Sequence, residues 1–189
     1  MSFSSEVKEE LAKRISPARH CQIAELAAIM HFSGQYGRSA EGDFMIGFQT
    51  ENEAVVRKGF TLLQKTFNIE TKIFVRENSH LKRVKVYTIE ITDPEEIQVI
   101  FQALRLVTNS IDQGTLVLSD MLVVQQNCCK RAFIRGAFLA SGSISDPEKG
   151  YHFEIVCSDA KRAEQLQTII RSFSVDAKIV PVSYTHLRA

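Results

Sequence analysis

The 189-residue sequence lacks the long apolar run that a membrane-spanning helix needs, and its N-terminus lacks the apolar core of a signal peptide. It also lacks low-complexity segments. Strong charge of either sign is missing, because 23 basic residues nearly balance 22 acidic ones and leave a formal net charge of +1. These absences predict a soluble, cytoplasmic, globular protein without membrane association. Any nucleic-acid surface on it has to be local.

Cysteine is scarce, and its spacing carries no familiar metal-binding signature. None of the cysteines forms a Cys-x-x-Cys pair, and no pair of histidines lies close to them in sequence. Residue preference instead predicts reduced and mostly buried thiols. We therefore expect no metal site and no cofactor. The four residues concerned are Cys21, Cys128, Cys129 and Cys157.

One pattern occurs twice in the chain. The segments CQIAELAAIMHFSGQY (21–36) and CKRAFIRGAFLASGSI (129–144) share one layout at a constant offset of 108 residues. Each has small residues four apart and ends in Ser-Gly. Rows of small residues let two helices cross with their backbones nearly in contact. Simple packing against other elements is the alternative, which two copies in register make less favourable. The predicted repeat interface consists of Ala24, Ala28, Ala132, Gly136 and Ala140.

The elements that follow each helix also repeat. Alternation and capping patterns predict strands at 43–50, 71–77 and 83–92 and helices at 52–66 and 93–108 after the first copy. After the second copy they predict a strand at 151–157 and a helix ending at 171, and SVDAKIV (174–180) matches NIETKIF (68–74). The sequence thus predicts an α+β fold: a pseudo-two-fold saddle with antiparallel sheets and an incomplete second repeat.

This organisation divides the chain into four parts. Residues 1–108 hold an N-terminal helix and the first repeat, and 109–127 form a connector with a short helix around 118–125. Residues 128–180 form the second, truncated repeat. The tail 181–189 matches nothing in the first copy, and we interpret it as non-native.

The two helices resemble the motif of the LAGLIDADG homing-endonuclease superfamily. IRGAFLASG (134–142) and LAAIMHFSG (26–34) both lie over its nine-residue consensus. In those nucleases, the acid before the last glycine of each helix holds divalent metal over the scissile phosphates. Here Ser33 and Ser141 occupy both positions, and a hydroxyl is a poor substitute for a carboxylate as a ligand of a hard cation. The resemblance therefore implies lost metal sites, no catalytic residues and a protein that is not an enzyme.

The opening MSFSSEVKEELAKR and the segment 128–144 are also similar to the bacterial WhiA family, over residues 1–180. The resemblance implies a degenerate LAGLIDADG-like domain followed by a helix-turn-helix domain, which makes the main DNA contact and which we expect to be missing here. It implies a nucleoid-associated DNA-binding transcription regulator, acting in sporulation in some bacteria and in cell division and chromosome segregation in others. Protein partners are also expected. A protein-interaction scaffold without DNA contact and, less favoured, an active homing endonuclease are the alternatives.

In the nucleases of this superfamily the sheets form a saddle over the duplex. The segment in the corresponding place here, 72–91, is rich in basic side chains. Alternation places Arg83, Lys85 and Tyr87 on one face of a strand, where basic and aromatic groups could follow phosphates. A solvated hairpin protected from edge pairing is the alternative, and the small net charge favours it. The candidate DNA-binding residues are Lys72, Arg76, Lys82, Arg83, Lys85 and Tyr87.

Two charged or titratable residues of the motif helices are interpreted as having no direct functional role. Arg135 lies off the small-residue stripe, and a solvated helix face is the favoured interpretation, with contact to phosphate or to an acidic partner as the alternative. His31 sits in the middle of its helix with no second ligand in sequence, which favours a partly buried structural histidine.

Overall fold

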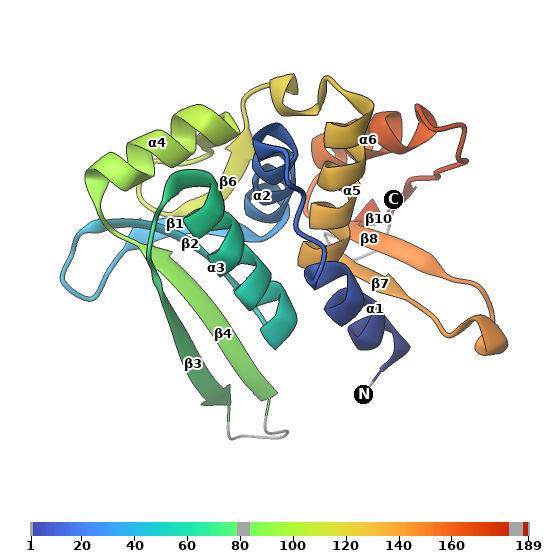
Figure 1. Ribbon diagram of the computed structural model, residues 1–189, viewed down its shortest axis with the longest axis horizontal. Coiled ribbons are helices and arrows are strands. Elements are labelled where there is room, and N and C mark those ends of the chain that lie inside the picture. The colour runs from blue at the N-terminus through green and yellow to red at the C-terminus, as the bar shows by residue number, and fades with distance from the viewer. Residues whose placement is uncertain (1, 79–83, 182–186, 189) are drawn as a thin grey trace.

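A central pair of helices with a sheet on each side forms the core of the protein (Figure 1). The structure is a computed structural model that describes residues 2–78, 84–181 and 187–188. Helices α2 (Arg19–Ser33) and α5 (Asn127–Ser141) lie side by side at the centre, one from each repeat. The predicted α+β class with antiparallel sheets is confirmed.

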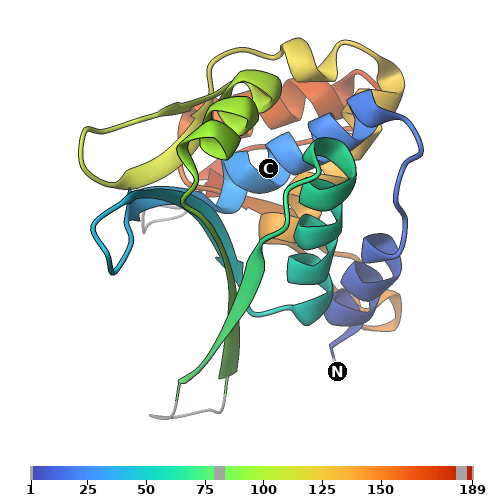
Figure 2. The same ribbon diagram turned by 60° about the vertical axis from the view of Figure 1, so that its left-hand side comes forward.

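The first sheet has six strands in the order β3-β4-β2-β1-β6-β5. Helices α3 (Glu53–Phe67) and α4 (Pro94–Leu104) lie on the same side of this curved sheet as α2, and among the described residues no helix lies on its other side (Figure 2). The strands are β1 (Gly34–Arg38), β2 (Phe44–Thr50), β3 (Lys72–Asn78), β4 (Val84–Ile91), β5 (Leu106–Thr108) and β6 (Gly114–Leu118).

The second sheet has four strands in the order β7-β8-β10-β9, and α6 (Ala160–Arg171) packs against it. Its strands are β7 (Gly142–Ile144), β8 (Phe153–Cys157), β9 (Val180–Pro181) and β10 (Leu187–Arg188). Short 3₁₀ turns occur at Leu122–Val124 and Pro147–Lys149. Helix α1 (Phe3–Ala12) contacts both α3 and α5, so the N-terminus joins the two repeats.

Glycine lets each central helix continue directly into a strand. A Cβ on Gly34 would overlap the carbonyl oxygen of Met30, and one on Gly142 would overlap the Phe138 side chain. The strands that begin at these glycines, β1 and β7, are absent from the sequence-based prediction. The helical pattern of the preceding residues gives no indication of these two short strands.

Three further segments differ from the prediction. The helix expected to reach residue 108 ends at Leu104, because Arg105 adopts the left-handed conformation with φ of 59° and β5 follows. The supposed connector contains β6, which pairs with β1 and β5 inside the first sheet. In the second repeat, residues 175–179 form no strand, although their sequence matches the β3 region. None of the described helices is long and apolar enough to cross a membrane.

Candidate functional site

The small residues of α2 and α5 lie where the two helices approach most closely. Ala24 and Ala28 are fully buried, and Ala132 is 1% exposed. A Cβ on Gly136 would lie 2.8 Å from the Cβ of Ala28 and would overlap the carbonyl oxygen of Glu25. Only a residue without a side chain fits at that point. The fifth residue of the predicted interface, Ala140, is half-buried.

Serine hydroxyls occupy the C-terminal tips of both helices. Ser33 Oγ donates to the carbonyl oxygen of Ile29 at 2.7 Å, and Ser141 Oγ donates to that of Ala137 at 3.5 Å. Each hydroxyl thus turns back onto its own helix, four residues earlier. Within the described part of the chain, no set of three or more carboxylate, histidine or cysteine ligands converges at these tips.

His31 links the tip of α2 to the first sheet and to α6. The residue is 2% exposed. Its Nδ1 accepts a hydrogen bond from the backbone N–H of Leu118 at 3.1 Å, and its Nε2 lies 3.3 Å from Oε1 of Gln165. The neutral tautomer with hydrogen on Nε2 satisfies both contacts. Burial, followed by the nearby Arg162 guanidinium, lowers the pKa of His31 from 6.5 to about 4. His31 is therefore more completely buried than the sequence suggests.

Arg162 of α6 contacts the same end of α2. The side chain is almost fully buried; Nε donates to the carbonyl oxygen of His31 at 2.9 Å and a terminal nitrogen donates to that of Leu116 at 2.9 Å. Its other terminal nitrogen pairs with Asp159. A cation thus satisfies one carbonyl group at the end of α2, where the helix dipole is negative, and one in β6. These contacts connect the C-terminal end of α2 to α6 and to β6.

A buried cluster of charges spans the crossing of the two helices. Glu25 is fully buried; Arg135 of α5 donates to both of its carboxylate oxygens, at 2.9 and 2.8 Å, and Nζ of Lys58 in α3 lies 2.8 Å from Oε1. Lys58 also donates to the carbonyl oxygens of Leu11 and Arg14. The interpretation of Arg135 as part of a solvated face is wrong, because the close backbone approach at Gly136 brings Glu25 within its reach.

Strand register separates the candidate DNA-binding residues between two faces. Ile73 of β3 pairs with Ile89 of β4, and both pack into the core on the helix side. Because side chains alternate, Lys72 and Arg76 lie on the opposite, outer face of the sheet. That outer face is the one that no described helix covers.

Lys85 and Tyr87 lie on the helix side instead. Tyr87 packs against the core and its hydroxyl donates to a Glu53 carboxylate oxygen at 3.4 Å, while Lys85 Nζ lies 4.0 Å from Oε1 of Glu77. Lys85 and Tyr87 thus share one face of β4, as alternation predicts, but it is not the face that carries Lys72 and Arg76. The remaining candidates, Lys82 and Arg83, lie outside the described residues.

The outer face of the first sheet is modestly charged. Among its described strand residues the charged side chains are Lys72, Arg76 and Glu90. Apolar side chains share this face, with Phe74 44% exposed and Val107 43% exposed. Two cations and one carboxylate give the face only a weak attraction for phosphate.

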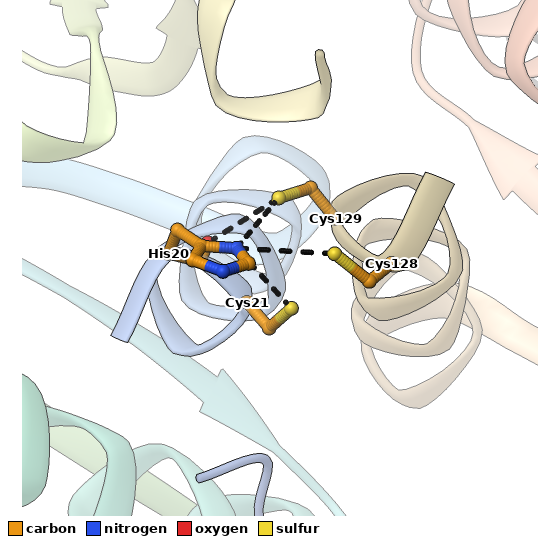
Figure 3. A group of neighbouring side chains, drawn as sticks. All are labelled: His20, Cys21, Cys128 and Cys129. Carbon is orange, nitrogen blue, oxygen red and sulfur yellow. Dashed lines mark hydrogen bonds between the residues drawn. The ribbon is translucent and has the colours of Figure 1, made fainter. Parts of the chain in front are cut away.

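At the opposite end of the helix pair, the structure gathers four potential metal ligands that the sequence-based prediction missed (Figure 3). They are His20 and Cys21 of α2 and Cys128 and Cys129 of α5. Burial, followed by the charges of the neighbouring thiols, raises the pKa of Cys129 to about 11. A signal for this cluster is present in the sequence: the offset of 108 extends one residue further toward the N-terminus and relates His20 to Cys128.

The family models and the curated relatives name one family. The family model described as the WhiA N-terminal LAGLIDADG-like domain matches residues 19–107, and the WhiA LAGLIDADG-like domain matches residues 130–186. A protein named probable cell division protein WhiA, from Lachnoclostridium phytofermentans, is 48% identical over 180 residues, covering 95% of this chain and 58% of that relative. The chain thus spans little more than half the length of that relative.

Two solved structures share the fold. The full-length WhiA structure from Thermatoga maritima superposes with a TM-score of 0.68 at 22% identity, covering 100% of this chain and 56% of that one. I-DmoI, solved in complex with DNA and Mn, superposes with a TM-score of 0.59 at 11% identity, covering 90% of this chain and 89% of that one.

Proposed function

The chain belongs to the WhiA family, and from that membership we propose that it is the non-catalytic LAGLIDADG-like part of a DNA-binding regulator of cell division, acting at the nucleoid. The observation that supports the proposal is the presence of serine in place of acidic residues at the C-terminal ends of α2 and α5. Where the nuclease motif has metal-binding acids, Ser33 and Ser141 direct their hydroxyls at their own helices. In this proposal the saddle holds DNA weakly, and a helix-turn-helix domain outside this chain recognises sequence and directs transcription, in sporulation or in chromosome segregation where the organism requires it.

The non-catalytic half of the proposal predicts intact DNA. Supercoiled plasmid incubated with the protein and Mg²⁺ or Mn²⁺ is expected to stay supercoiled, because serine hydroxyls hold hard divalent cations poorly. Agarose electrophoresis measures the outcome, with a homing endonuclease on its own target as the positive control. Cleavage that depends on the added metal and is lost in a Ser33→Ala/Ser141→Ala double variant would restore the endonuclease alternative.

The DNA-binding half predicts a shallow salt dependence. The described outer face offers two cations, Lys72 and Arg76, and each neutralised phosphate contributes about 0.9 to the slope of log affinity against log salt. Replacing both with alanine is therefore expected to reduce the magnitude of that slope by roughly 1.8. Fluorescence anisotropy with a random duplex, titrated from low to moderate salt, measures it.

Lys85→Ala provides the matched control for this experiment. Its side chain is an exposed strand lysine like Lys72, but it lies on the helix side of the sheet near Glu77. The control is expected to keep the wild-type slope. A loss in Lys85→Ala of about half that of the double variant, which is the same loss per charge removed, would show a diffuse charge effect in place of an outer-face contact.

A protein-interaction scaffold is the second candidate function. The exposed Phe74 and Val107 on the outer face favour it, because apolar groups beside few charges suit a protein partner better than phosphates. Absence of duplex binding at low salt, in protein shown to be folded by circular dichroism, would decide for the scaffold.

A further inference from the structure

The four side chains His20, Cys21, Cys128 and Cys129 converge between the N-terminal ends of α2 and α5 (Figure 3). Nδ1 of His20 lies 3.1 Å from the Sγ of Cys129, 3.4 Å from that of Cys21 and 3.9 Å from that of Cys128. One ligand atom from each residue lies within 4.8 Å of all the others. Three sulfurs and one imidazole nitrogen thus surround a common point.

These distances suit a tetrahedral transition-metal site. Zinc binds sulfur at about 2.3 Å and imidazole nitrogen at about 2.0–2.1 Å, which places tetrahedral ligand atoms roughly 3.5–3.8 Å apart. The His20 contacts lie on both sides of that range, so small side-chain rotations would bring the four atoms into position. Thiolates and imidazole together select zinc over magnesium or calcium, which prefer oxygen.

The placement of the ligands on the two helices is a second, independent observation. Each repeat contributes two adjacent residues at equivalent positions, since Cys128 and Cys129 follow His20 and Cys21 by the repeat offset of 108. Both pairs lie in the first turn of a helix whose N-cap, Ala18 or Gln126, makes no side-chain cap hydrogen bond. Two helix N-termini, the positive ends of the helix dipoles, therefore lie beside the cluster and favour anionic ligands there.

Access and burial are divided between the ligands. Cys21 is 5% exposed and Cys129 is 4% exposed, whereas His20 and Cys128 are exposed. All four cysteines of the chain are free thiols in this structure. An ion can thus reach the cluster from solvent through His20 and Cys128 while the two buried sulfurs form its inner wall.

We propose that His20, Cys21, Cys128 and Cys129 bind one zinc ion that joins the two repeats at the N-terminal end of the central helix pair. Binding of Zn²⁺ releases the three thiol protons to solvent and forms three zinc–sulfur bonds and one zinc–nitrogen bond, with no change in oxidation state. The ion has a structural role because the four side chains fill its coordination sphere. It connects the two repeats at the end of the helix pair opposite Ser33 and Ser141. This proposal differs from the sequence-based expectation of no metal site.

Metal analysis of the purified chain tests this proposal. Protein stripped with a chelator and titrated with Zn²⁺ is expected to bind one equivalent. Its melting temperature should rise by roughly 5–10 °C when free zinc exceeds the dissociation constant a hundredfold. Co²⁺ in place of Zn²⁺ should give the intense ultraviolet absorption of thiolate-to-cobalt charge transfer and the visible bands of a tetrahedral ion.

Single-site variants locate the site. Cys128→Ser and His20→Ala change exposed residues, so the fold should survive, and each is expected to weaken zinc binding by 100-fold or more. Loss of a direct ligand should exceed the roughly 10- to 100-fold cost of losing a residue that only supports one. Cys157→Ala and His152→Ala are the matched controls, because these residues are of the same types and lie outside the cluster. The controls should retain full stoichiometry, the cobalt spectrum and the zinc-dependent rise in melting temperature.

Three results would overturn the proposal. The first is wild-type protein, prepared under reducing conditions, that binds no zinc at micromolar free metal. The second is equal zinc affinity in wild type, Cys128→Ser and His20→Ala. The third is freshly isolated, metal-free protein in which peptide mapping finds a disulfide between Cys21 and Cys128 or Cys129, which would make the cluster a redox pair.

Discussion

Glu25→Ala is expected to lower the free energy of unfolding by about 3–5 kcal/mol, as the loss of one partner from a buried ion pair does in other proteins. The carboxylate is fully buried between Lys58 and Arg135. Without it, two positive charges remain at the helix crossing, and the Lys58 side chain has no exposed surface through which to reach water. Urea denaturation followed by circular dichroism measures the change.

The pH dependence of this variant gives a second readout. Burial lowers the pKa of Lys58, and the charge of Glu25 opposes that effect. With Glu25 removed, the pKa in the folded state falls further below its value in the unfolded chain, so the unfolded chain binds more protons between the two values. The stability of Glu25→Ala should therefore rise with increasing pH above neutrality more steeply than that of the wild type.

Two comparisons separate this effect from general disruption. The double variant Glu25→Leu/Lys58→Met removes Glu25 and Lys58 together and leaves Arg135, whose side chain is 21% exposed, as the remaining charge of the cluster. It should recover part of the loss because apolar replacements of similar volume tolerate burial. Glu53→Gln disrupts an exposed ion pair with Arg57 in α3 and should change stability far less. A Glu25→Ala loss no greater than that of Glu53→Gln would show that the buried cluster is dispensable.

The fold was predictable where one local pattern decides the structure. The apolar period gave α2 and α5, alternation gave β2 and β4, and Asp93 caps α4 by accepting the backbone N–H groups of Glu95 and Glu96. The repeat then fixed the architecture. The pattern does not predict β1 and β7 because each begins at the glycine that directly follows its helix, where no local turn signal separates the two conformations.

The candidate site was less predictable because its contacts join distant parts of the chain. Arg135 and Glu25 are 110 residues apart, and neither has a sequence neighbour that reveals the partner. The side of the sheet on which Lys85 and Tyr87 lie was unpredictable for another reason. Alternation assigns residues to two faces of a strand, but it does not reveal which face the helices cover. Only the pairing of Ile73 with Ile89 in the core settles that question.

The stability of the wild-type protein is expected to fall by about 3 kcal/mol between pH 6.5 and pH 4 through His31 alone. The pKa of this buried ring is lowered from 6.5 to about 4, chiefly by burial and then by Arg162. In this interval His31 binds a proton in the unfolded chain, whereas the ring stays largely neutral in the folded protein. The contribution is therefore complete above pH 6.5 and lost as the pH falls to about 4.

The local geometry explains why the folded ring resists protonation. A proton on Nδ1 would face the backbone N–H of Leu118, which now donates to that nitrogen at 3.1 Å, and the contact would turn from attraction to repulsion. Asp159 favours the charged ring, but Lys161 joins Arg162 in opposing it. Protonation thus weakens the contact between the tip of α2 and β6 of the first sheet.

His31→Asn tests the assignment, because the asparagine Oδ1 can accept the Leu118 N–H and does not titrate. The variant should be less stable than the wild type at neutral pH but lose less stability between pH 6.5 and pH 4 in urea denaturation series. His152→Asn is the control, since His152 is exposed and should leave the wild-type pH profile in place. If His31→Asn kept the full acid sensitivity of the wild type, the neutral buried ring would not be its source, and that sensitivity would need another explanation.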